Sequence, residues 1–178
     1  PFTDISGHGA ESAILNAHSL GLMNGVGGNE FSPDAPLTRA MFVTILYRLE
    51  KEPEAGRATF IDVASGSWYQ KAVGWAYENG IVTGVSESKF APEDEITREQ
   101  LAAILYRYAA FKGYDLTTAD NINYTDQDSI SGYASTAVLW TLEHSIMNGN
   151  GDGTFAPQNS TTRAQAAAVL IRINDNLK

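Results

Sequence analysis

Three arginines in this chain directly follow a threonine, and each stands at the start of a run of helix-forming residues. They are Arg39 in "LTRA", Arg98 in "ITRE" and Arg163 in "TTRA". The helix dipole disfavours a cation in the first turn, so a repeated arginine there requires an explanation. A guanidinium group beside the free N–H groups of a helix start is suited to bind an anionic ligand group, such as a carboxylate. We therefore predict that these three arginines contact a ligand.

An alternative is that each arginine pairs with an aspartate of a neighbouring unit and holds the units together. The candidate partners stand at matching positions in "FTD", "FID" and "YTD": Asp4, Asp62 and Asp126. They precede the expected first helices by several residues, which is too far for a helix cap but suits tying a loop backbone. For these aspartates, a structural role and ligand contact are equally open.

The chain contains three copies of one pattern, because the residues around each Thr-Arg pair align over most of its length. A glycine stands thirteen residues before each threonine, an aromatic residue seven before it and a proline five before it. We expect residues 1–178 to form a single module with three repeats and two polar linkers. The repeats span about 1–50, 59–109 and 123–174, and the linkers span 51–58 and 110–122.

Each repeat is expected to fold as a helix, a glycine-rich loop and a second helix. After each threonine, apolar residues fall at offsets 4, 7, 8 and 11, which is the period of an amphipathic helix. The threonine is a good N-cap, and a glutamine three residues later completes a capping box, except that Met41 breaks it in the first repeat. Strand signals are nearly absent. Another set of arginines suits the negative end of the helix dipole and is interpreted as structural: Arg48, Arg107 and Arg172.

Two helices of this size cannot bury their apolar faces alone, so the three repeats must pack around one shared core. We expect Ile45, Ile104 and Val169, which are equivalent positions in the second helices, to be buried near its axis. Sequence physics does not choose between an open solenoid and closure around a pseudo-threefold axis.

Composition excludes several classes of function. The formal net charge is -9 and no basic stretch is dense, so nucleic acid is not an expected partner. Without cysteine the chain has no disulfide or Cys-based zinc site, and its apolar runs are far shorter than the ~20 residues that span a bilayer. Its three histidines have no spacing typical of a metal site or catalytic triad, so no metal, cofactor or enzyme is predicted. The start at "PFTDI" suggests a monomeric module of a larger, exported protein.

The order of these landmarks resembles the S-layer homology (SLH) domain: Phe-x-Asp, a helix, Gly, a loop ending in Phe-x-Pro, and Thr-Arg-x-Glu opening a second helix. The closest stretches are "KFAPEDEITREQLAAILYRYA" and "GNGDGTFAP". Three consecutive copies imply an all-α, compact pseudo-threefold module. The resemblance further implies extracellular, noncovalent anchoring at the cell surface, through grooves between repeats that bind a cell-wall polysaccharide carrying pyruvate ketals. The rival hypothesis is a scaffold whose grooves grip a peptide or partner protein.

The chain departs from the family's pattern at two places. First, a methionine or a glutamine replaces the glutamate of Thr-Arg-x-Glu in each of the three repeats. Second, the family's tryptophan at the head of the first helix is retained only in the second repeat, as Trp68. The equivalent residue is Gly9 in the first repeat and Tyr133 in the third. An aromatic ring stacks well on a sugar, although such residues more often belong to a core. Trp68 and Tyr133 therefore join the arginines and aspartates as predicted ligand-binding residues. We expect fewer than three grooves to bind well.

Overall fold

The computed structural model describes residues 2–177, and this part of the chain is helical. It contains six α-helices, one short 3-10 helix (η1, Gln127–Ser129) and isolated β-bridges, but no strand. The α-helices are α1 (Glu11–Ser19), α2 (Arg39–Leu49), α3 (Gln70–Glu78), α4 (Arg98–Lys112), α5 (Ser135–Glu143) and α6 (Arg163–Asn176). The prediction of an all-α chain is confirmed. None of the described helices is long and apolar enough to cross a membrane.

The three threonines cap the second helix of each repeat, as the sequence predicts. Thr38, Thr97 and Thr162 are the N-cap residues of α2, α4 and α6, and each side chain accepts the N–H of the residue three positions later. In α4 and α6 the glutamine at that position completes a capping box, which α2 lacks because it has Met41 there. Helix α4 continues to Lys112, so the segment 110–122 is not entirely a linker.

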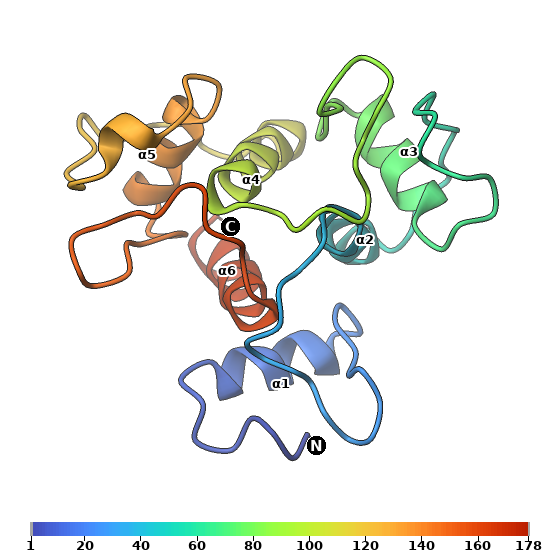
Figure 1. Ribbon diagram of the computed structural model, residues 1–178, viewed down its shortest axis with the longest axis horizontal. Helices are drawn as coiled ribbons and strands as arrows, with labels where there is room; N and C mark the ends of the chain where they lie inside the picture. The colour runs from blue at the N-terminus through green and yellow to red at the C-terminus, as the bar shows by residue number, and fades with distance from the viewer. Residues whose placement is uncertain (1, 178) are drawn as a thin grey trace.

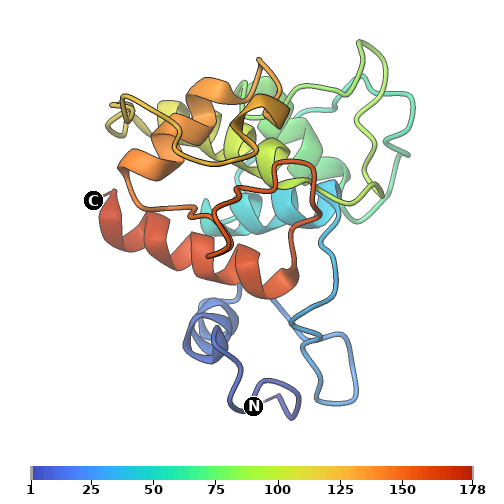
Figure 2. The same cartoon turned by 60° about the vertical axis from the view of Figure 1, so that its left-hand side comes forward.

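The second helices form the centre of the molecule and the first helices surround them (Figure 1). Each outer helix packs on the inner helix of the preceding repeat: α3 on α2, α5 on α4 and α1 on α6. Figure 2 shows α1 against α6, which is the contact that joins the first repeat to the last. The arrangement is therefore closed around a pseudo-threefold axis, and an open solenoid is excluded.

A ring of backbone hydrogen bonds closes this arrangement just before the inner helices. The N–H of Leu37 donates to the carbonyl of Thr161, that of Thr161 to Ile96, and that of Ile96 back to Leu37, at 2.8–2.9 Å. The three residues occupy equivalent positions in the three repeats, so each repeat is bonded to both others. The predicted core residues Ile45, Ile104 and Val169 are 3–4% exposed and belong to one apolar cluster, as expected.

Candidate functional site: three grooves between repeats

The arginine of each Thr-Arg pair reaches across to the loop of the next repeat. Arg39 is 5% exposed, and its Nε donates to the carbonyl of Phe90 at 2.9 Å. Its guanidinium group lies over the Phe90 ring, 4.7 Å from the centroid, and Nη2 is 3.4 Å from the carbonyl of Thr83. Arg39 therefore joins the first repeat to the second.

The other two arginines make the same contacts around the ring. Arg98 donates to the carbonyls of Phe155 and Asn148, both at 2.7 Å, and lies over the Phe155 ring. Arg163 donates to the carbonyl of Phe31 at 2.8 Å and so joins the third repeat to the first. Burial lowers the pKa of all three guanidinium groups below the ordinary value of arginine.

The aspartates hold the same loops from within their own repeats. The carboxylate of Asp62 accepts the N–H groups of Phe90 and Ala91 at 2.9 and 2.8 Å, and Asp126 accepts those of Phe155 and the following alanine. Asp4 binds the first loop in the same way. No ion pair joins an arginine to one of these aspartates in residues 2–177. The alternative of an Arg–Asp pair is therefore wrong about the partner, because the arginines bind carbonyl groups of the loops.

Hydrogen bonds to these loops also change the acidity of the aspartates. The pKa of Asp4 is lowered from 3.8, first because its carboxylate accepts the Phe31 N–H. Burial raises the pKa of Asp62, but the N–H groups of Phe90 and Ala91 outweigh it and the net pKa is lowered.

The helix starts do not offer free N–H groups to a ligand. In α2 the N–H groups of Arg39 and Ala40 donate to the carbonyls of Asp94 and Pro92 in the second repeat, and α4 and α6 repeat this pattern with the next loop. The capping threonine accepts the third N–H group. The expectation that helix N–H groups bind an anion is wrong, because the neighbouring repeat already uses them.

Three equivalent grooves run beside the inner helices. The α4 groove has a volume of about 340 Å³ and is lined by Arg39, loop residues 83–85, Gln100 and Arg107 of α4, and Tyr133 of the third repeat. Each groove thus combines an arginine from the preceding repeat, an arginine near the end of its own inner helix and, in two of them, an aromatic ring from the following repeat.

The other two grooves differ from the α4 groove in their walls. The α2 groove, of about 250 Å³, is lined by Met41, Arg48, Trp68 and Arg163. The α6 groove, of about 170 Å³, contains Arg98, Gln165 and Arg172. It adjoins a hollow of about 670 Å³ lined by Gly9, where the other grooves have an aromatic ring. Met41 and Gly9, both from the first repeat, therefore affect two different grooves.

The arginines near the helix ends line the grooves, which the sequence analysis missed. Arg48 and Arg172 donate to the carbonyls of Leu22 and Ile146, at 3.2 and 3.0 Å. The side chain of Arg107 makes no hydrogen bond or ion pair with any described residue and lines the α4 groove. Their constant position ten residues after each threonine was the available signal, but it fitted a role in the helix dipole equally well.

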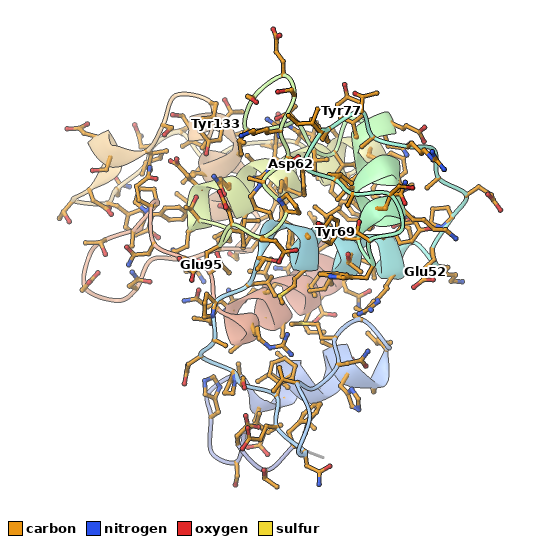
Figure 3. All side chains as sticks on the ribbon, turned by 45° about the vertical axis from the view of Figure 1, so that its right-hand side comes forward. Glu52, Asp62, Tyr69, Tyr77, Glu95 and Tyr133 are labelled. Atoms are coloured by element: carbon orange, nitrogen blue, oxygen red, sulfur yellow. The ribbon has the colours of Figure 1, made fainter. Side chains whose placement is uncertain are left out.

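The two aromatic residues lie at the surface. Tyr133, labelled in Figure 3, is 56% exposed and Trp68 is 59% exposed, so neither is a core residue. The hydroxyl group of Tyr133 donates to the carboxylate of Glu99 at 3.1 Å. Partial burial, followed by the charge of Glu99, raises the pKa of Tyr133 to about 12. Tyr133 lines the α4 groove and Trp68 lines the α2 groove.

Comparison with known proteins identifies relatives at the cell surface. The chain is 30% identical over 180 residues to the surface-layer 125 kDa protein of Lysinibacillus sphaericus, covering 99% of this chain and 15% of that protein. It is 26% identical over 155 residues to the cellulosome-anchoring protein of Acetivibrio thermocellus, covering 84% of this chain and 34% of that protein.

A third relative carries an enzyme's name. The chain is 33% identical over 171 residues to the amylopullulanase of Thermoanaerobacterium thermosulfurigenes, covering 95% of this chain but 9% of that protein. The chain spans less than a fifth of the length of the first curated relatives it matches. The enzyme's name describes the whole relative, of which the match covers a small part.

The family model for the S-layer homology domain matches residues 1–41, 59–102 and 123–167, which correspond to the three repeats. With the surface proteins among the relatives, this match places the chain outside the cell, as an anchoring module of the bacterial cell surface. The chain belongs to the S-layer homology domain family.

Proposed function

We propose that this module anchors a larger exported protein noncovalently by binding a cell-wall polysaccharide that carries pyruvate ketals. The observation that carries the proposal is the α4 groove, where Arg107 has no acceptor within the described protein and lies in the same groove as Arg39 and Tyr133. A ketal-linked pyruvate presents a carboxylate on a compact sugar. The groove offers the guanidinium group and the aromatic face that such a ligand requires.

Short contacts must supply the affinity. The net charge is -9, so the summed field repels an anionic glycan and is screened beyond about 8 Å at physiological salt. A carboxylate in contact with Arg107 gains charge-assisted hydrogen bonds, and the ring of Tyr133 covers the apolar face of the sugar. The N–H groups of Arg39 that are not bound to Phe90 and Thr83 face the same ligand.

The remaining predicted residues have related roles in this proposal. Arg163 and Trp68 serve the α2 groove, and Arg98 serves the α6 groove, where no aromatic ring is present. Asp4, Asp62 and Asp126 act indirectly, because their carboxylate oxygens bind loop N–H groups. They fix the shape of the loops that form the groove walls.

Retention on purified wall polymer tests the proposal. The protein is passed over immobilised polymer before and after mild acid removes the ketals. We expect retention by the intact polymer and loss of retention after acid treatment. Equal retention on both polymers would show that the ketal carboxylate is not recognised. If neither polymer retained the module but an immobilised partner protein did, the result would favour the scaffold hypothesis.

A further inference from the structure

A buried glutamate adjoins the α4 groove and has no counterpart in the other two repeats. Glu99 is the third residue of the Thr97-Arg98-Glu99 sequence, and the equivalent residues are Ala40 and Ala164. Only 3% of Glu99 is exposed to solvent. Burying a carboxylate is costly unless hydrogen bonds satisfy it, so its contacts indicate what it stabilises.

All the side-chain hydrogen bonds of Glu99 come from the third repeat. Its Oε1 accepts from the hydroxyl groups of Ser131 and Tyr133, at 2.8 and 3.1 Å, and from Nε2 of Gln158 at 2.9 Å. Its Oε2 accepts the N–H of Ser131 at 2.9 Å. The carboxylate therefore binds both the tip of Tyr133 and the backbone two residues before it.

These bonds restrain a side chain that is otherwise at the surface. Tyr133 is 56% exposed, yet Glu99 binds its hydroxyl group and also the backbone N–H of Ser131, two residues before it. Trp68, the equivalent residue beside the α2 groove, makes no side-chain hydrogen bond with a described residue and touches Tyr69 edge to face. Fixing a side chain before the ligand binds lowers the entropic cost of binding.

We infer that Glu99 is a positioning residue for the α4 groove, which holds the Tyr133 ring ready for the sugar. The identity of the ligand in this inference rests on the proposed function, whereas the restraint of Tyr133 by Glu99 does not depend on it. The α4 groove then has an aromatic wall that is fixed before the ligand binds. In the α2 groove the aromatic ring is held by packing alone, and the α6 groove has no aromatic ring.

The chain offers a substitution that its own fold already accepts. Glu99→Ala introduces the residue found at both equivalent positions, Ala40 and Ala164, so the helix start is expected to form. Glu93→Ala is the matched control, because Glu93 is exposed, makes no side-chain hydrogen bond with residues 2–177 and carries the same charge.

The restraint is tested first in the free protein. With 3-fluorotyrosine at position 133, we expect the ¹⁹F resonance to move towards the shift of free fluorotyrosine in Glu99→Ala, and not in Glu93→Ala. An unchanged resonance in Glu99→Ala would overturn the inference, whether or not the protein binds a ketal.

The effect on binding is tested with a synthetic hexose glycoside carrying a pyruvate ketal. By titration calorimetry, we expect Glu99→Ala to weaken binding roughly three- to tenfold, the range expected for loss of one or two hydrogen bonds. In a Tyr133→Ala background the same substitution should change affinity less than about twofold, because its effect passes through the ring.

The outcomes separate the two proposals. Equal losses in the two backgrounds would assign Glu99 a merely structural role between repeats and overturn the inference. Wild-type affinity in Glu99→Ala would also overturn it. If the wild-type protein does not bind the glycoside, the proposed function fails, and the ¹⁹F result alone decides the role of Glu99.

Discussion

At the scale of single residues, the arginines divide into two sets with different chemistry. Arg39, Arg98 and Arg163 are nearly buried and bind loop carbonyl groups of the next repeat. The arginines near the helix ends line the grooves, and the side chain of Arg107 has no acceptor among residues 2–177. A buried guanidinium group that donates to loop carbonyl groups contributes to stability, whereas a guanidinium group in a groove that has no such acceptor is available to a ligand.

Removing a buried arginine is therefore expected to destabilise the fold. Arg98→Ala removes two hydrogen bonds of 2.7 Å and a ring contact, and leaves carbonyl groups without a donor. We expect the free energy of unfolding to fall by about 2 to 3 kcal/mol, measured by urea denaturation. Arg57→Ala, at an exposed position in the linker 51–58, is the control and should change little. A similar small change in both variants would contradict the structural role.

The aspartates make stability depend on pH in the acid range. The folded pKa of Asp4 and of Asp62 lies below the unfolded value of 3.8, so unfolding takes up protons as pH falls. Their stabilisation is complete above that value and is lost as pH falls through the folded pKa. We expect the unfolding free energy to decline as the pH falls below about 4. In the variant with Asp4→Asn and Asp62→Asn this decline should be smaller, and an equal decline would assign it to other groups.

The sequence predicted the positions of these residues but not their partners. Repetition identified Arg39 and Asp62 as equivalent to residues in the other repeats, since spacing alone carries that information. Their partners are backbone groups of Phe90 and Ala91, and any residue type supplies an N–H or a carbonyl group. Residue identity therefore does not reveal a backbone partner. For this reason the sequence allowed an Arg–Asp pair, which the structure does not contain among residues 2–177.

At the scale of the elements, the loop before each inner helix has a backbone conformation that residue propensities do not predict. The residue between the aromatic residue and the proline has a positive φ in all three repeats: Ser32 at 56°, Ala91 at 58° and Ala156 at 54°. This left-handed conformation is disfavoured for residues other than glycine, asparagine and aspartate. The carboxylates of the aspartates accept the N–H groups of these residues and maintain the strained conformation.

Glycine at such a position should relieve the strain. We expect Ala91→Gly to raise the free energy of unfolding, by up to about 1 kcal/mol, because glycine adopts a positive φ without a steric penalty. The control is Ala102→Gly in the interior of α4, which should lower it by a similar amount. Thermal and urea unfolding of both variants provide the measurement. A loss of stability in Ala91→Gly would show that the loop conformation is not strained.

The helices themselves were predictable, since their apolar period and threonine caps are local properties of the sequence. Thr97 and Gln100 form the predicted capping box, and Met41 breaks it as expected. The packing of α3 on α2 and of α1 on α6 was not predictable from such patterns, because each pair comes from different repeats. The family resemblance, and not periodicity, predicted the closed arrangement.

At the scale of the whole molecule, closure makes every groove a joint product of several repeats. The α4 groove takes Arg39 from the first repeat, α4 from the second and Tyr133 from the third. The α6 groove adjoins the side of the first repeat where Gly9 replaces the aromatic residue. Because of this mixing, the prediction of unequal grooves stays a prediction, and we attribute the inequality to the aromatic ring that is missing at Gly9.

Restoring that ring should strengthen the α6 groove. A Cβ atom added at Gly9 meets no atom within 4 Å, so a side chain can begin at this position without displacing the backbone. We expect it to raise affinity for wall polymer roughly two- to tenfold, the range expected for one additional aromatic contact. Trp68→Gly makes the inverse change in the α2 groove and should weaken binding. Weaker binding by Gly9→Tyr would indicate that the open hollow itself receives ligand.

In the proposed function, Arg107 binds the ketal carboxylate in the α4 groove. Titration calorimetry with a hexose glycoside that carries a pyruvate ketal tests it most directly, using wild type, Arg107→Ala and the control Arg57→Ala. The Arg107 side chain makes no hydrogen bond or ion pair with a described residue, so its removal should leave the fold intact. We expect the same substitution to reduce affinity about tenfold or more. The wild type should not bind the same glycoside without its ketal. Equal affinity of wild type and Arg107→Ala for the ketal would show that Arg107 does not bind the ketal carboxylate.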